Sequence, residues 1–303
     1  MKFNDLQQMV GNTPHVLVRG PETGGARVYV KLEGYNPTGS IKDRACLWII
    51  RSMLDEGLLQ PGMTLLDASS GNMACAIAFY GKLMGYAATV VANSKLTDDK
   101  RNFIQYFGAT LLQAGDFTIE GNRVCREMVE RSATAQYCFL DQLHNWANPR
   151  AHYESTGPEI LADFPEVEMV VGSLGSGGAL CGTGQFLKEA RPSLKIVAVQ
   201  AASGSKIPGA GSFDDGDYIT PFIQKGFDEG IFDHLVKVGE PAAARRTTEL
   251  RDQGIFVGLQ TGAVLHAAVE AVRELGVTGD IVLLSGDAGW KSLGKLLSLS
   301  ETR

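Results

Sequence analysis

Short β-branched runs alternate with longer amphipathic segments along this chain, and such alternation is typical of parallel α/β architecture. In the first half, polar turns separate each predicted strand from a helical pattern. The predicted strands are residues 28–31, 64–67, 88–92 and 108–112, and the predicted helices are residues 45–54, 73–83, 98–107 and 118–132. Each βα unit has about the length that a right-handed crossover connection needs.

The pattern restarts after Asp141. The strands predicted there are residues 168–171, 195–199 and 280–284, and the helices are residues 180–190, 242–253 and 263–275. Residues 203–217 are rich in Gly, Ser and Asp, so we expect an irregular surface loop. A chain of 303 residues can build two cores. We therefore expect an α/β protein of two domains, each a twisted, mostly parallel sheet flanked by helices.

Composition and charge narrow the function classes. The net charge of −6 argues against non-specific nucleic-acid binding, which needs a basic face. The first ten residues lack a signal-peptide pattern, and glycines and a lysine interrupt the apolar stretch 74–92, so no membrane span is predicted. Five widely spaced cysteines and five scattered histidines give no metal-ligand spacing. We expect reduced, buried cysteines, a cytoplasmic location, and no metal or membrane partner.

The segment from Lys31 to Arg44 carries the strongest chemical signal. It places Lys42 directly after an Asn-Pro-Thr-Gly-Ser-Ile turn and at the start of a helix. The partial positive charge of a helix N-terminus disfavours an ammonium and so lowers the pKa of a lysine there. Such a lysine is a nucleophilic amine, and a buried one commonly forms a Schiff base with a carbonyl group. A lone loop lysine is more often a surface residue, so this hypothesis needs support from other segments.

A glycine-rich loop, Gly175-Ser176-Gly177-Gly178-Ala179, separates a predicted strand from a helix. Glycines let successive backbone N–H groups converge, and the following helix adds its dipole, so the loop suits a phosphate. Neither nucleotide fingerprint fits, because no Gly-Lys-Ser/Thr follows and Leu180 replaces the third glycine of a dinucleotide loop. The loop predicts a phosphate site for another kind of ligand, with a plain glycine turn as the structural alternative.

A second strand-to-helix loop is Ser69-Ser70-Gly71-Asn72. Its backbone donors could hold a carboxylate, and the Asn72 amide could bond a phenolic oxygen. The same residues also suit a helix cap that has no function.

Together these segments have the order and spacing of the cysteine synthase family. They are the Lys42 segment, the 69–72 loop, Gln142 with Thr156-Gly-Pro-Glu159, the 175–179 loop and Gly258-Leu-Gln-Thr-Gly262. From Gly11-Asn-Thr-Pro14 to Asp287-Ala-Gly-Trp-Lys291, the chain resembles these pyridoxal-5′-phosphate (PLP) enzymes of the tryptophan-synthase-β-like fold (fold type II), and most closely the cysteine synthase B branch.

The resemblance implies a domain arrangement. A larger, discontinuous PLP-binding domain would comprise residues 1–44 and 146–303, and a smaller, mobile substrate-binding domain would comprise residues 45–145. PLP would lie in the cleft between them, and the protein would be a homodimer.

The resemblance also implies a role for each site residue. Lys42 would hold PLP as an internal aldimine and then remove the substrate Cα proton. Asn72 would contact the pyridine 3′-oxygen, and either Gln260 or Thr261 would face the pyridine nitrogen. The phosphate would be bound by Gly175, Ser176, Gly177, Gly178 and Ala179, and the substrate carboxylate by Ser69, Ser70, Gly71, Met73 and Gln142.

Three positions depart from the family pattern, which has Thr at Met73 and Ala179 and Ser at Gln260. Met73 removes a hydroxyl and adds apolar bulk, whereas Ala179 removes one phosphate hydrogen bond, worth about 1.5–3 kcal/mol if uncompensated. These changes predict altered substrate handling without loss of PLP, because Lys42 remains.

The segment 258–262 also predicts the reaction class. Neither Gln260 nor Thr261 is charged, so the ring nitrogen need not be protonated. A neutral pyridine is a weaker electron sink and favours prompt expulsion of a β-leaving group. We therefore expect β-elimination and β-replacement through an aminoacrylate rather than transamination.

The leading hypothesis is PLP-dependent β-replacement on O-acetyl- or O-phospho-L-serine. A sulfur nucleophile (sulfide, a thiol or a thiocarboxylate carrier) would give L-cysteine or an analogue. Met73 and Gln260 motivate an alternative in which an amine or unusual thiol gives a β-substituted alanine such as diaminopropionate. A non-catalytic PLP-binding paralogue is a third hypothesis, which only the three departures support.

Overall fold

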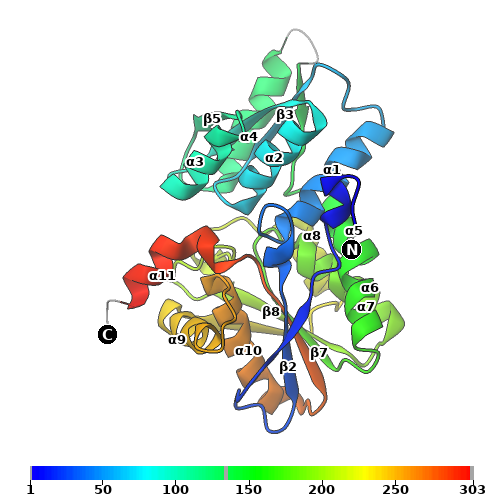
Figure 1. The fold of residues 1–303 in the computed structure, drawn as a ribbon, viewed down its shortest axis with the longest axis vertical. Coiled ribbons are helices and arrows are strands. Elements are labelled where there is room, and N and C mark those ends of the chain that lie inside the picture. Colours follow the sequence, from blue (N-terminus) through cyan, green and yellow to red (C-terminus); the bar gives the residue numbers. More distant parts are fainter. Residues whose placement is uncertain (1, 133–135, 301–303) are drawn as a thin grey trace. The chain divides into compact units, whose positions relative to one another are not determined.

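The chain divides into two compact units in a computed structural model that describes residues 2–132 and 136–300 (Figure 1). The first unit comprises Met1–Ile41 and Pro149–Arg303, and the second comprises Lys42–Asn148. The second unit is therefore continuous in sequence, and it interrupts the first.

The first unit is built on a six-stranded sheet with the order β1-β2-β10-β7-β8-β9. All neighbouring strands are parallel except β1, which is antiparallel to β2. Strands β2 and β10 join distant parts of the chain, and Arg27 of β2 bonds both carboxylate oxygens of Asp280 at 2.7 and 2.9 Å. The strands are β1 (His15–Val18), β2 (Arg27–Lys31), β7 (Met169–Ser173), β8 (Lys195–Ala201), β9 (His234–Val238) and β10 (Asp280–Leu284).

Helices cover both faces of this sheet, because successive residues of a strand point to opposite sides. On β7, Val171 packs in a core with α9 and α10, whereas Val170 packs in a second core with α6, α7 and α8. These helices are α6 (Gly157–Asp163), α7 (Gly178–Ala190), α8 (Pro221–Asp228), α9 (Glu240–Arg251) and α10 (Leu259–Leu275). A short helix, α5 (Ala147–Ala151), and a π-helical turn (His152–Thr156) lead into α6.

The second unit contains a four-stranded parallel sheet with the order β5-β4-β3-β6. Helix α4 packs on one face, where Cys125 meets Leu66, Ala68 and Val91. The strands are β3 (Thr64–Ala68), β4 (Ala87–Ala92), β5 (Thr110–Gln113) and β6 (Tyr137–Phe139), and the helices are α1 (Lys42–Asp55), α2 (Asn72–Met84), α3 (Asp98–Tyr106) and α4 (Thr118–Arg131). The predicted fold class, two mostly parallel sheets flanked by helices, is confirmed.

The sequence pattern missed three strands, β1, β6 and β9, which lie at the edges of their sheets and are only partly buried. It also missed the short helices α5, α6, α8 and α11 (Leu293–Ser300). The predicted irregular loop 203–217 is confirmed, except that Phe213–Asp215 forms one 3₁₀ turn. The five cysteines are buried and free, as predicted.

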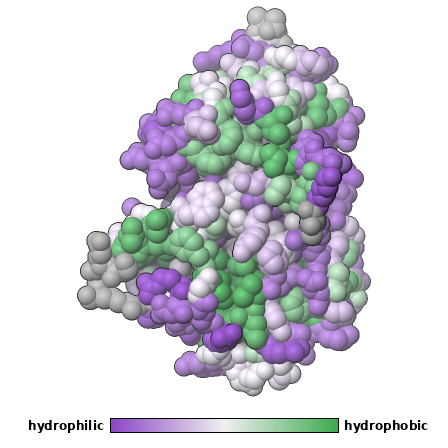
Figure 2. Space-filling model, viewed as in Figure 1, coloured by the Kyte–Doolittle hydropathy of each residue, from purple (hydrophilic) through white to green (hydrophobic). Residues whose placement is uncertain are grey.

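The C-terminal helix α11 (Leu293–Ser300) leaves part of its apolar surface exposed. Leu296 and Leu299 pack against the core of the first unit, whereas Leu293 and Leu297 are 42% and 53% exposed. Figure 2 shows the resulting apolar surface (green) over this helix. Among the described residues, no helix combines the length and the apolar character that crossing a membrane requires.

Candidate active site

Lys42 is the first residue of α1. Its side chain is half-buried, and this burial lowers the pKa of its amine to about 8. The sequence predicted a lowered pKa from the helix N-terminus, and the direction is confirmed, but the cause is desolvation of the ammonium. Part of the Lys42 amine is therefore neutral and nucleophilic close to physiological pH.

The turn before this lysine is held by the segment that follows β10. The Ile41 N–H donates to the Gly286 carbonyl at 2.9 Å, and the Ala288 N–H donates to the Gly39 carbonyl at 3.0 Å. Gly39 has a φ of +84°, and a Cβ there would overlap the Trp290 ring, so only glycine fits. The backbone that delivers the lysine is thus fixed on one side by a segment from the far end of the chain.

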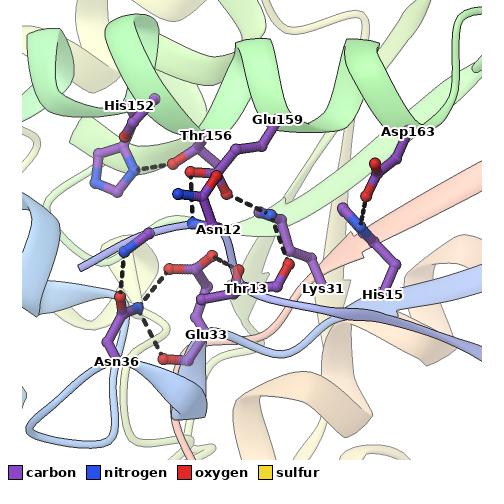
Figure 3. Close-up of polar contacts among 12 residues, drawn as sticks. Asn12, Thr13, His15, Lys31, Glu33, Asn36, His152, Thr156, Glu159 and Asp163 are labelled. Atoms are coloured by element: carbon purple, nitrogen blue, oxygen red, sulfur yellow. Dashed lines mark hydrogen bonds and ion pairs between the residues drawn. The ribbon is translucent and has the colours of Figure 1, made fainter. Parts of the chain in front are cut away.

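A buried polar network holds the start of the same turn (Figure 3). Asn36 accepts the Gly11 N–H at 2.9 Å and donates to the Glu33 carboxylate at 2.8 Å. Glu33, which is fully buried, also accepts the Thr13 hydroxyl at 2.6 Å. The N-terminal Gly-Asn-Thr-Pro segment is therefore a structural support for the lysine turn.

An ion pair in this network joins β2 to α6 (Figure 3). Lys31 Nζ lies 2.6 Å from Glu159 Oε2, and the two side chains are 0% and 15% exposed. Lys31 also donates to the Thr13 carbonyl at 3.1 Å, and Glu159 accepts the Asn12 N–H at 2.9 Å. The pair therefore fixes the N-terminal segment. This gives Glu159, the last residue of the Thr156-Gly-Pro-Glu159 motif, a structural role.

The glycine loop lies between β7 and α7, and α7 begins at Gly178. Gly177 has a φ of +80°, and a Cβ there would overlap Ile223. A Cβ at Gly175 would lie only 2.9 Å from the carbonyl oxygen of Gly209. The first N–H groups of a helix have no intrahelical acceptor, so this loop and the start of α7 suit a phosphate.

Ser176 and Ala179 complete the loop. The Ser176 carbonyl accepts the Thr220 hydroxyl at 2.6 Å, and Thr220 caps α8 by accepting the Ile223 N–H at 3.3 Å. This contact anchors the loop to the next helix. Ala179 is half-buried in the first turn of α7 and provides only its backbone N–H.

The first turn of α10 contains Gln260 and Thr261, which the structure distinguishes clearly. Thr261 is fully buried, and its Oγ1 has no hydrogen-bond partner among the described residues. Gln260 instead donates from Nε2 to the Ser173 hydroxyl at the end of β7. Leaving a buried hydroxyl unpaired costs free energy, which a bound ligand can recover. Thr261 is thus the better candidate for a ligand contact.

In the second unit, the loop 69–72 joins β3 to α2. Ser69 Oγ accepts the Gly71 N–H at 3.1 Å, and Ser70 Oγ accepts the Asn93 N–H at 2.6 Å. Because both oxygens accept, both O–H groups can donate, for example to a carboxylate. Asn72 begins α2, whose first-turn N–H groups point toward the loop.

Gln142 lies beside this loop, and a buried carboxyl joins the two. Gln142 Nε2 donates to the Ala68 carbonyl at 2.8 Å. The fully buried Asp67 accepts the Ala68 N–H at 2.8 Å and the Gln142 N–H at 3.3 Å. Burial raises the pKa of Asp67 to about 8, and the negative charge of Asp141 adds to this rise. The sequence analysis missed Asp67, although its place at the end of a buried strand just before the loop was a usable signal.

The predicted site residues thus form two sets. The Met73 side chain is buried, with 1% exposure. Only its backbone N–H could therefore donate to an anion such as the substrate carboxylate. Lys42 opens the second unit. The first unit holds Gly175, Ser176, Gly177, Gly178, Ala179, Gln260 and Thr261, and the second holds Ser69, Ser70, Gly71, Asn72, Met73 and Gln142.

The chain belongs to the family of pyridoxal-phosphate dependent enzymes, whose family model matches residues 6–286. It is similar to the cysteine synthase of Staphylococcus aureus (strain Mu50), 31% identical over 301 residues, which cover 96% of this chain and 95% of that protein. It is also similar to cysteine synthase B of Pseudomonas aeruginosa, 33% identical over 279 residues, 91% of each chain. A crystal structure of O-ureido-L-serine synthase superimposes with a TM-score of 0.88 at 28% identity, covering 98% and 96% of the two chains. The protein is therefore a PLP-dependent synthase of the cysteine synthase family, as its sequence predicted.

The residues present fit this cofactor. The half-buried amine of Lys42 suits an aldehyde, and the backbone cradle that opens at Gly175 suits a phosphate. The unpaired hydroxyl of Thr261 offers a polar contact in an otherwise buried position.

Proposed function

We propose that this enzyme catalyses β-replacement on an L-serine activated at its hydroxyl, as the O-acetyl or O-phospho ester. A sulfur nucleophile then gives L-cysteine or a close analogue. The observation that carries the proposal is the first turn of α10, where the ring nitrogen would meet a buried, uncharged hydroxyl, Thr261 Oγ1. An uncharged partner leaves the pyridine neutral, which favours loss of a β-substituent over transamination.

Lys42 would bond the cofactor aldehyde through its amine. Once substrate takes that place, the Lys42 amine would accept the proton from the substrate Cα and later return it. A pKa of about 8 supports this role, because about a tenth of the amine is neutral at pH 7 and about half at pH 8. When bound, the cofactor supplies the electron withdrawal that makes the Cα proton removable.

The other cofactor contacts would come from backbone and neutral groups. The N–H groups of residues 175–179 would bind the phosphate, with the Ser176 hydroxyl as an added donor. Asn72 would contact the 3′-oxygen of the ring from the start of α2. Thr261 rather than Gln260 would face the ring nitrogen, because the Gln260 amide is already engaged with Ser173.

The substrate carboxylate would be bound in the second unit. The hydroxyls of Ser69 and Ser70 and the first N–H groups of α2 would donate to it. Gln142 would add its amide from a position that its bond to the Ala68 carbonyl fixes. Fixing the carboxylate orients the Cα–H bond toward the base, which is the positional part of the catalysis.

A second candidate keeps this chemistry and changes the nucleophile. The similarity to O-ureido-L-serine synthase, together with Met73 and Gln260, supports an amine or an unusual thiol in place of sulfide. The product would then be a β-substituted alanine such as diaminopropionate.

A spectral titration of the holoenzyme tests both candidates. The visible absorption band of the lysine-bound cofactor is followed while O-acetyl-L-serine or O-phospho-L-serine is added, and sulfide, a thiol or an amine is added afterwards. Lys42→Ala should abolish the original band, whereas the matched control Lys82→Ala, on the exposed side of α2, should retain it. The ester that changes the band is the substrate, and the nucleophile that restores it is the second reactant.

The outcomes separate the candidates. Rapid recovery with sulfide and formation of cysteine support the first, whereas recovery with an amine alone supports the second. If neither ester changes the band of the wild-type enzyme, β-replacement on activated serine is wrong. A band that persists in Lys42→Ala would remove the assigned role of this lysine.

A further inference from the structure

Gln260 replaces the short serine of the family pattern, and its long side chain has a defined place in the first unit. Its Nε2 donates to the Ser173 hydroxyl, which in turn donates to the Gly209 carbonyl at 3.2 Å. The chain of bonds runs from the start of α10 through the end of β7 to the 203–217 loop. The Ser173 proton is used by Gly209, so Ser173 is an acceptor toward Gln260.

The amide oxygen of Gln260 is seated between two glycines. A Cβ at Gly209 or at Gly286 would overlap Gln260 Oε1. Gly209 has a φ of +91° and needs to be glycine for its backbone as well, but Gly286 has no such conformation. At Gly286, the three atoms nearest to an added Cβ all belong to Gln260. The absence of a side chain at position 286 therefore makes room for Gln260.

Both glycines contact backbone that serves the proposed cofactor site. The Gly286 carbonyl accepts the Ile41 N–H at 2.9 Å, and Ile41 is bonded to Lys42 along the chain. A Cβ at Gly175, the first residue of the glycine loop, would lie only 2.9 Å from the Gly209 carbonyl oxygen, so the two backbones approach closely there. One carboxamide thus touches the two segments that support the lysine turn and the loop.

We propose that Gln260 is a positioning residue. Held by Ser173 and seated between Gly209 and Gly286, it sets the separation between the backbone that ends in Ile41 and the start of the glycine loop. A serine at this position cannot span both contacts, because its side chain ends two carbon atoms earlier and lacks the amide. The inference rests on the proposed roles of Lys42 and the loop in holding PLP.

The test is a double-substitution cycle on Gln260→Ser and Gly286→Ala. Apoprotein of each variant is titrated with PLP, and the visible band gives the dissociation constant. We expect each single substitution to weaken PLP binding about tenfold, the effect of losing roughly one hydrogen bond. The double variant should bind no more weakly than Gln260→Ser alone, because the shorter side chain leaves room for the alanine methyl.

A second readout separates positioning from general damage. The pH dependence of the visible band should shift by about half a unit or more in Gln260→Ser, because the position of the Lys42 amine changes. Glu270→Gln, an exposed substitution on the same helix, should leave both the dissociation constant and the pH profile unchanged. If Gln260→Ser does not fold, Ser173→Ala removes the same bond without changing α10 and should reproduce its effects.

Three results would overturn the inference: unchanged PLP binding in Gln260→Ser, an unchanged pH profile, or losses that simply add in the double variant. Failure of the proposed function has a different signature, since wild-type enzyme would then bind PLP without Lys42 or would not respond to an activated serine.

Discussion

The Lys31–Glu159 ion pair allows a quantitative test of how the first unit is held together. The Lys31 side chain is fully buried, whereas that of Glu159 is 15% exposed. Glu159→Gln keeps the shape of the side chain but leaves the Lys31 ammonium, within the part of the chain that the structure describes, with the Thr13 carbonyl at 3.1 Å as its remaining acceptor. Lys31→Met removes the charge and leaves a carboxylate that still accepts the Asn12 N–H at 2.9 Å and reaches water.

These differences set the order of the effects. Stranding a buried charge costs about 3–5 kcal/mol, so Glu159→Gln should lower the free energy of unfolding by that amount. Lys31→Met should cost about 1–3 kcal/mol, because the remaining carboxylate is less buried and keeps one donor. The double variant strands no charge, so it should cost less than the sum of the single variants by about 2 kcal/mol or more.

The assay is urea unfolding of the apoprotein, followed by the fluorescence of a tryptophan in the first unit. Trp290 is the tryptophan of the first unit, and Trp48 and Trp146 lie in the second. In a Trp48→Phe/Trp146→Phe background, fluorescence reports unfolding of the first unit, and linear extrapolation gives its free energy. Glu154→Gln is the matched control; it breaks an Arg150 pair of the same length, 2.6 Å, in which both side chains are exposed.

The control should change the free energy of unfolding by less than about 0.5 kcal/mol. If Glu159→Gln costs no more than Glu154→Gln, the argument from burial is refuted. Strict additivity in the double variant would refute the claim that the two charges depend on each other.

Two further predictions concern Asp67 and Gly177. The folded pKa of Asp67 is about 8, well above its unfolded value, so the folded state holds a proton that the unfolded state loses between about pH 4 and 8. The free energy of unfolding of the wild type should therefore fall relative to that of Asp67→Asn over this range, by up to about 1.4 kcal/mol per pH unit. Above pH 8 the difference should stop growing. Urea unfolding of both proteins at pH 5 and pH 8 measures this, and parallel profiles would exclude a protonated Asp67. Gly177→Ala forces a methyl into Ile223 at a φ of +80°, so it should destabilise the protein by more than about 1 kcal/mol and weaken PLP binding, whereas Gly294→Ala, with nothing within 4 Å, should do neither. Thermal unfolding and PLP titration check this pair, and equal behaviour of the two variants would contradict it.

The regular βα units could be predicted from the sequence because strand and helix periods are both visible in them. The strand before the 69–72 loop and the helix after it were predicted within a residue of β3 and α2. Strand β1 was not predicted, because its residues 15–17 are exposed or half-buried at a sheet edge and therefore do not alternate clearly between apolar and polar. Helix α8 was not predicted, although Thr220 followed by Pro221 is a typical helix start.

The candidate site was predictable where its chemistry is local. Lys42 after its turn and the glycine loop are contiguous motifs, so their residue types alone pointed to an amine and a phosphate cradle. The choice between Gln260 and Thr261 could not be made from sequence, because it depends on Ser173, 87 residues away, as a partner. The role of Asp67 was not predicted for a similar reason, because its second hydrogen-bond donor, the Gln142 N–H, lies 75 residues further along the chain.

The position of β10 has a consequence for synthesis on the ribosome. This strand lies between β2 and β7, yet it is the last strand to be translated, and the pair Arg27–Asp280 joins residues 253 positions apart. The continuous segment Lys42–Asn148 can therefore fold early. Strands β1 and β2 pair with each other, but the other edge of β2 has no partner strand until β10 is translated. A nascent chain stalled before residue 280 would expose the edges of β2 and β7 to aggregation, so late-stage chaperone binding should concentrate on these two strands.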